Sequence, residues 1–231
     1  MKIRSDVTPS LHPAVIENIE NYSIYEGYLR GAREAFELVY TELGAIHDAR
    51  LSVAKNPTLN EAAKLLTVAE FASKRQDKIT RSFDMAREHL ISAANAAETA
   101  LNEPMKAPAH SAISAEIRAH AKGLSDKNRS AFINHALASE DVQTLSAMLG
   151  APGYLSGLKE VYRTAYTRSF HEQQNPNLVK RLDATKRALT LIDKYSPLIW
   201  SEVTKAVGAT WDEVNHIKKA KDEAERAFQA V

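Results

Sequence analysis

Apolar side chains recur at alternating steps of four and three from residue 25 onward. This spacing is a heptad pattern, which gathers apolar residues on one face of a long helix that packs against another helix. The sequence therefore predicts a helix that begins near residue 24 and ends before Pro57. Its seam consists of Tyr25, Leu29, Ala32, Phe36, Val39, Leu43, Ile46, Arg50 and Val53.

A second heptad pattern follows and stops before Pro104. We predict that Thr58 caps this helix and that Glu61 reaches back to the cap, as in a capping box. Because so short a connection leaves no room for a crossover, the two helices form an antiparallel hairpin at 24–102. The second seam consists of Leu65, Ala69, Ala72, Gln76, Ile79, Phe83, Ala86, Leu90, Ala93, Ala97 and Ala100.

Folding the chain at Pro57 predicts the register of the hairpin. It sets Gly31 near Ser82 and Gly27 near Ala86, and we expect these small residues, with Ala35, to let the two backbones approach closely. The second helix overshoots the first. Its alanine-rich end at 90–101 therefore needs another partner, which is a short helix at 14–22, the second half of the chain or another subunit.

Two prolines in residues 103–110 mark the best candidate for a boundary. The predicted division is an N-terminal segment with the hairpin at 1–103, a linker at 104–110 and a C-terminal helical bundle at 111–231. The fold class is all-α: a long, coiled-coil-like antiparallel hairpin followed by a bundle of shorter helices. The shorter helices are predicted at 111–122, 126–138, 140–149, 158–173 and from 177 onward. Ser125 and Ser139 are expected to cap the second and third of these, and a loop is expected at 151–157. The last stretch is expected to pause at Ser196-Pro197 and to restart at a capping box at Thr210–Glu213.

Composition narrows the classes of function. A formal net charge of +1 argues against a surface built throughout to bind phosphates or an anionic membrane. The chain has no cysteine, which removes disulfides and thiolate metal sites and favours a reducing compartment. The first twenty residues lack a signal-peptide pattern, and no stretch is long and apolar enough to span a membrane. We expect a cytoplasmic protein, or part of a particle assembled in the cytoplasm.

Two pairs of residues are the nearest approach to a metal site. Glu213 and His216 have the Glu-x-x-His spacing of di-iron helical bundles, but the chain has no second copy. We interpret Glu213 as the partner of the Thr210 cap and His216 as a surface residue. His47-Asp48 is the dipeptide of metal-dependent phosphohydrolases, but a dipeptide alone is a weak signal, and we favour an exposed position or one flanking the helix seam. No residue is predicted to be catalytic, to bind a cofactor or to hold a metal.

Residues 159–187 carry the one nucleic-acid signal. Three aromatic residues, Tyr162, Tyr166 and Phe170, are interleaved with the basic ones, as phosphate contacts with base stacking would require. Their spacing of four also fits a buried stripe with a solvated basic flank, which we favour. The seven basic residues, against three acidic ones, are Lys159, Arg163, Arg168, Lys180, Arg181, Lys186 and Arg187.

Long helices span distance and present extended faces, so the leading hypothesis is a non-enzymatic structural or assembly protein. It would act through helix–helix contacts in an oligomer or larger particle, and a phage-like virion is one such setting. The expected partners are other copies of the chain or other proteins. The alternatives are a helical adaptor that binds nucleic acid through the basic face at 159–187, and a metal-dependent helical enzyme.

Overall fold

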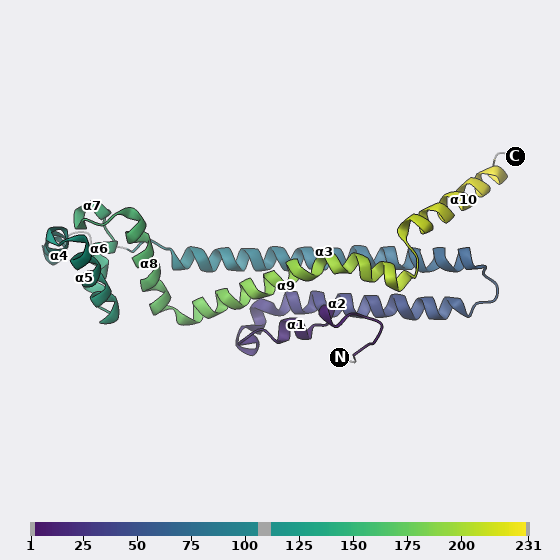
Figure 1. Cartoon of the computed structure of the whole chain (residues 1–231), viewed down its shortest axis with the longest axis horizontal. Coiled ribbons are helices and arrows are strands. Elements are labelled where there is room, and N and C mark those ends of the chain that lie inside the picture. Colours follow the sequence, from purple (N-terminus) through teal and green to yellow (C-terminus); the bar gives the residue numbers. More distant parts are fainter. Residues whose placement is uncertain (1–2, 106–111, 230–231) are drawn as a thin grey trace. The chain divides into compact units, whose positions relative to one another are not determined.

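The computed structural model describes residues 3–105 and 112–229, and the described part is helical without strands (Figure 1). The all-α class and the helical hairpin are confirmed. The helices are η1 (Pro9–Leu11), α1 (Ala14–Glu17), α2 (Tyr22–Ala54), α3 (Glu61–Leu101), α4 (Ala112–Gly123), α5 (Asp126–Ala138), α6 (Val142–Leu149), α7 (Gly153–Ser156), α8 (Glu160–Gln174), α9 (Pro176–Val207) and α10 (Trp211–Gln229).

The chain forms two compact units. Unit 1 comprises Met1–Ala93 and Asp183–Val231, and unit 2 comprises Ala94–Leu182. The predicted division at 104–110 would instead place 183–231 with the C-terminal bundle. The structure groups these residues with the hairpin because the apolar stripe of α9 enters the same core as α2 and α3. Residues 106–110 of the predicted linker lie outside the described residues.

Unit 1 is built on α2, α3 and α9, which lie side by side (Figure 1). Phe36 of α2 is fully buried; its ring centre lies 5.1 Å from that of Phe83 in α3 and 6.2 Å from that of Tyr195 in α9. The predicted α2 seam is buried from Tyr25 to Ile46. Arg50 is instead exposed, and its guanidinium covers Gly208 in the turn before α10.

Two details of the hairpin differ from the prediction: the residue that caps α3, and the register in which α2 packs against α3. Asn60 caps α3, since its Oδ1 accepts the Ala63 amide at 2.8 Å, whereas Thr58 donates to Asn56 in the loop. The Phe36–Phe83 and Glu42–Arg75 contacts show the register. Counting outward along α2 and α3 from these pairs places Gly31 level with residues 86–88, at least one turn from Ser82.

The alanine-rich end of α3 packs within unit 2. Ala94, Ala97 and Leu101 form a small core with Leu178, Val179 and Leu182 from the start of α9. The seam has moved by one residue, because Ala93 is half-buried and Ala100 is exposed. A straight α-helix drifts from a strict heptad repeat over such a length, which explains the shift. The second half of the chain supplies the partner, and the predicted helix at 14–22 is only the four-residue α1.

Helix α9 continues through Pro197, where the sequence predicted a pause. An internal proline removes one backbone hydrogen bond and costs roughly 3 kcal/mol. Buried residues on both sides of it, among them Ile192, Ile199 and Val203, hold the helix against the unit 1 core. Tertiary packing therefore outweighs the local preference of proline.

Unit 2 otherwise contains α4 to α8 around a core that includes Ile133, Leu145 and Met148. The predicted cap of α5 is confirmed, since Ser125 Oγ accepts the Asn128 amide at 3.4 Å. The cap of α6 is Asp141, which accepts the Thr144 amide at 3.0 Å, and not Ser139, which ends α5. The predicted loop at 151–157 contains the short helix α7.

Candidate protein-binding groove

An open groove runs between α2 and α3 in unit 1. It encloses about 740 Å³. The wall from α2 consists of Gly31, Glu34 and Leu38, and the wall from α3 consists of Lys74, Asp77, Lys78, Arg81, Ser82, Met85, Ala86 and His89. We call this feature the α2–α3 groove.

Apolar side chains of the α2–α3 groove are open to solvent. Met85 is 70% exposed, and Leu38 and Gly31 are half-buried. Ile24 precedes Gly31 by seven residues, so it continues the same face of α2, and it is 69% exposed. Large apolar side chains this exposed on one face of a helical hairpin are typical of a surface that binds another protein.

The glycines beside the groove have no packing role within the described chain. A Cβ at Gly27 or Gly31 would meet no heavy atom within 4 Å among the residues that the structure describes. The prediction that these glycines bring α2 and α3 together is therefore wrong. Glycine inside a helix costs roughly 0.5–1 kcal/mol relative to alanine. Because these glycines have no side chains, nothing projects from the surface of α2 at their positions.

Charges of opposite sign lie on opposite walls. Glu34 is the one charged residue of the α2 wall, whereas the α3 wall carries three cations and Asp77. Lys78 is paired with Glu42, with 2.8 Å between Nζ and Oε1. Neither Glu34 nor Arg81 forms an ion pair within residues 3–105 and 112–229. Lys74 and Asp77 of the α3 wall form none either, so the groove presents two cations and two anions that the described chain leaves unpaired.

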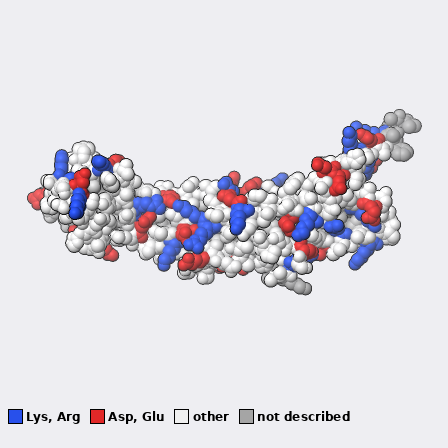
Figure 2. Space-filling view, in the orientation of Figure 1, with Lys and Arg blue, Asp and Glu red and all other residues white. Residues whose placement is uncertain are grey.

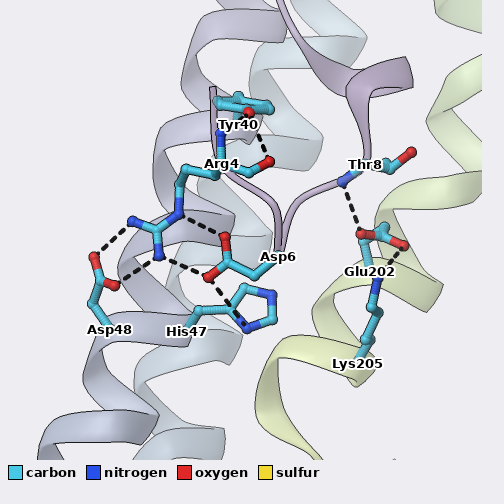
Figure 3. Close-up of polar contacts among 8 residues, drawn as sticks. All are labelled: Arg4, Asp6, Thr8, Tyr40, His47, Asp48, Glu202 and Lys205. Carbon is cyan, nitrogen blue, oxygen red and sulfur yellow. Dashed lines mark hydrogen bonds and ion pairs between the residues drawn. The ribbon is translucent and has the colours of Figure 1, made fainter. Parts of the chain in front are cut away.

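The His47-Asp48 candidate belongs to an ion-pair network instead of a metal site (Figure 3). Arg4 donates to both oxygens of Asp48, at 2.9 and 2.7 Å, and to both oxygens of Asp6, at 2.9 and 2.8 Å. Its backbone amide donates to the Tyr40 hydroxyl at 2.7 Å. These contacts hold the N-terminal segment against α2. The sequence offered no signal that pairs Arg4 with Asp48, because the two residues are far apart along the chain.

The Arg4 guanidinium shifts the pKa values of the carboxyl groups in this network. Its hydrogen bonds lower the pKa of Asp6 from 3.8 to about 2 and also lower the pKa of Asp48. Burial lowers the pKa of His47, whose Nδ1 lies 4.0 Å from Asp6 Oδ2. The neutral imidazole is thus favoured at neutral pH. The carboxylates that could accompany it as metal ligands are occupied by Arg4.

Glu213 and His216 do not converge on a metal site either. Glu213 accepts hydrogen bonds from the Thr210 amide at 2.8 Å and hydroxyl at 3.0 Å, and these bonds lower its pKa. The predicted capping box is confirmed, and His216 is exposed. In the part of the chain that the structure describes, no three His, Asp or Glu side chains are grouped so that they could hold a metal ion.

The basic face at 159–187 is divided between the two units, and several of its arginines are paired with carboxylates. Arg168 pairs with Glu98 and Glu172, both at 2.7 Å, and Arg163 pairs with Glu160. Tyr162 is 57% exposed, and Tyr166 and Phe170 are only partly buried against the unit 2 core, so the expected buried stripe forms only in part. On the face drawn in Figure 2, basic and acidic side chains are interspersed in each unit. No helix in the described ranges is long and apolar enough to cross a membrane.

A second groove of about 630 Å³ lies on another side of α3, beside α9 and α10. Both tryptophans of the chain line it, with ring centres 5.8 Å apart, and Trp200 is 56% exposed. Gln76, the polar interruption of the predicted seam, also lines it. Two carboxylates and two lysines balance one another there, so its charge favours neither an anionic nor a cationic ligand. In the α2–α3 groove, by contrast, the two walls differ in charge.

The fold and the groove define an all-α protein built on a helical hairpin, with one face of the hairpin open. No protein-family model matches the chain, and neither the curated proteins nor the solved structures include one that matches it.

Proposed function

We propose that this protein is a non-enzymatic assembly protein that binds a helical partner in the α2–α3 groove. The observation that carries the proposal is the groove itself, which is lined by exposed Met85 and by Gly31, a glycine that serves no packing in the described chain. An amphipathic helix laid in the groove would join α2, α3 and α9 in a four-helix arrangement and bury the apolar face. Small residues in the wall let the two backbones approach.

The setting we propose is the cytoplasm, or a particle assembled there, with a phage-like virion as one example. The absence of cysteine and the near-zero net charge support this setting. The hairpin supports a role in assembly, because long helices expose continuous faces to which other helices can bind.

The test compares a groove variant with a matched surface variant. Met85→Glu places a charge in the groove, and Leu51→Glu changes an equally exposed apolar residue of α2 outside it, since Met85 is 70% and Leu51 is 63% exposed. Each chain is isolated from the cells that naturally make it, and the mass of its complexes is measured by sedimentation. We expect Met85→Glu alone to release the 25.6 kDa chain from complexes.

Complexes that survive Met85→Glu unchanged would contradict the proposal, as would a wild-type chain that sediments only as a monomer in its native extract. Far-UV circular dichroism of both variants verifies that the helices are intact.

A further inference from the structure

We infer that the α2–α3 groove is filled by the same groove of a second copy of this chain, related to the first by a two-fold axis. The inference rests on the proposed function and names its partner. An isologous contact needs a surface that is complementary to itself, and the features of the groove meet this requirement in charge and in shape.

Charge complementarity selects the direction of the axis. An axis parallel to α2 and α3 lays the α2 wall of each copy over the α3 wall of the other. Glu34 then faces a wall on which Lys74 and Arg81 outnumber Asp77, since Lys78 is paired with Glu42. A two-fold axis perpendicular to the helices would instead place the α2 walls of the two copies against each other, and their cation-rich α3 walls against each other. Repulsion between like charges disfavours that second arrangement.

The levels of Glu34 and Arg81 along the helices fit the parallel axis. The Phe36–Phe83 contact places Glu34 level with the residues just after Phe83, about one helical turn from Arg81. A two-fold axis parallel to the helices adds no shift along them. Glu34 of one copy therefore comes within reach of the long Arg81 side chain of the other, and symmetry forms this ion pair twice.

Shape complementarity follows from Gly31. The Phe36–Phe83 contact places Gly31 about one helical turn beyond Met85, whose exposed side chain belongs to the α3 wall. In the two-fold arrangement Met85 of each copy packs over the position where Gly31 of the other has no side chain. The contact buries a methionine that is 70% exposed in the single chain. It also gives Gly31 a function.

The experiment exchanges the charges. Glu34→Arg places two cations opposite each other in a dimer, and Arg81→Glu places two anions opposite each other. Each variant alone should dimerise roughly tenfold more weakly than the wild type, because each reversal changes two symmetric ion pairs. An equimolar mixture of the two variants restores both attractive pairs. Sedimentation equilibrium of the purified chains, alone and mixed, measures the dissociation constants.

Restored dimerisation in the mixture supports the inference, because no other occupant of the groove predicts it. A purified wild-type chain that stays monomeric at every concentration overturns it, and so does a dimer that neither reversal weakens. The proposed function is tested separately: native complexes that are lost with Met85→Glu, together with a purified monomer, would mean that the groove binds a different protein.

A second variant covers the case in which a charge reversal disturbs folding. Gly31→Ala adds a methyl group in open space and should leave the single chain folded, since no described atom lies within 4 Å of the new Cβ. The same methyl group obstructs Met85 of the second copy. We expect weaker dimerisation together with an equal or higher unfolding midpoint, whereas unchanged dimerisation would overturn the packing of Met85 on Gly31.

Discussion

Gly31 and Gly44 lie in the same helix, but a methyl group at each would meet different surroundings. At Gly31 it would meet nothing within 4 Å, whereas at Gly44 it would lie 2.9 Å from Arg4 Cδ. Gly44 therefore makes room for the Arg4 side chain, and Gly31 has no equivalent role in the single chain. The same residue type serves different purposes at the two positions, which the sequence pattern alone does not distinguish.

The first prediction compares the two glycines. Gly31→Ala should raise the free energy of unfolding by about 0.5–1 kcal/mol, because alanine is the better helix former. Gly44→Ala should raise the free energy of unfolding by less than Gly31→Ala, or should lower it, because Arg4 must move away from its carboxylate partners. Urea unfolding of the monomer, followed by tryptophan fluorescence, measures both. A loss of stability in Gly31→Ala would show that the position is packed.

The second prediction concerns the pH dependence of the Arg4 network. The folded pKa of Asp6 is about 2, below its ordinary value of 3.8, so the carboxylate stabilises the fold above pH 4. That contribution is lost as the pH falls through about 2. The stability advantage of the wild type over Asp6→Asn should therefore shrink between pH 4 and pH 2. Its size is at most about 1 kcal/mol, as for other partly exposed ion pairs.

Urea unfolding at a series of pH values measures this difference, and tryptophan fluorescence is the suitable signal because Trp200 and Trp211 both lie in unit 1. An advantage that stays constant down to pH 2 would show that the Asp6–Arg4 contact does not form.

At the scale of single elements, the start of α3 shows how a local signal is misinterpreted. Thr58 with Glu61 satisfies the spacing of a capping box, and Asn60 is an equally good capping residue closer to the helix. In the structure Asn60 accepts the Ala63 amide, while Thr58 is bound to Asn56. Two adjacent candidates of similar preference cannot be ranked by spacing alone, and the course of the loop decides between them.

The third prediction tests this cap. Asn60→Ala should lower the free energy of unfolding by roughly 0.5–2 kcal/mol, because one amide at the start of α3 loses its partner. Thr58→Ala is the matched control, and as a change in an exposed loop it should stay within about 0.5 kcal/mol of the wild type. Thermal or urea unfolding of the two variants decides the matter. The reverse order of effects would restore Thr58 as the cap.

At the scale of the whole molecule, the two units differ in the size of their cores. The unit 1 core extends along α2, α3 and α9, whereas unit 2 has two smaller clusters. Burial of apolar surface is the main favourable contribution to folding, so the larger core should be the more stable one. The helices α3 and α9 each continue from one unit into the other.

The fourth prediction is that the units unfold in separate steps. Both tryptophans report on unit 1, whereas far-UV circular dichroism reports on all helices. We expect circular dichroism to show a loss of helix at urea concentrations where the tryptophan fluorescence is still native. Noncoincident transitions of this kind show that unfolding is not two-state. Superimposable curves from the two signals would mean that the units unfold as one.

The heptad spacing by itself determined the hairpin, most of its buried residues and the ends of several shorter helices, because periodicity and capping are local properties of the chain. It could not determine the partner of Arg4, the continuous helix through Pro197 or the division into two units, since these depend on contacts between residues far apart in sequence. The α2–α3 groove could not be predicted for the same reason. Only the tertiary structure shows which face of the hairpin α9 covers and which face stays open.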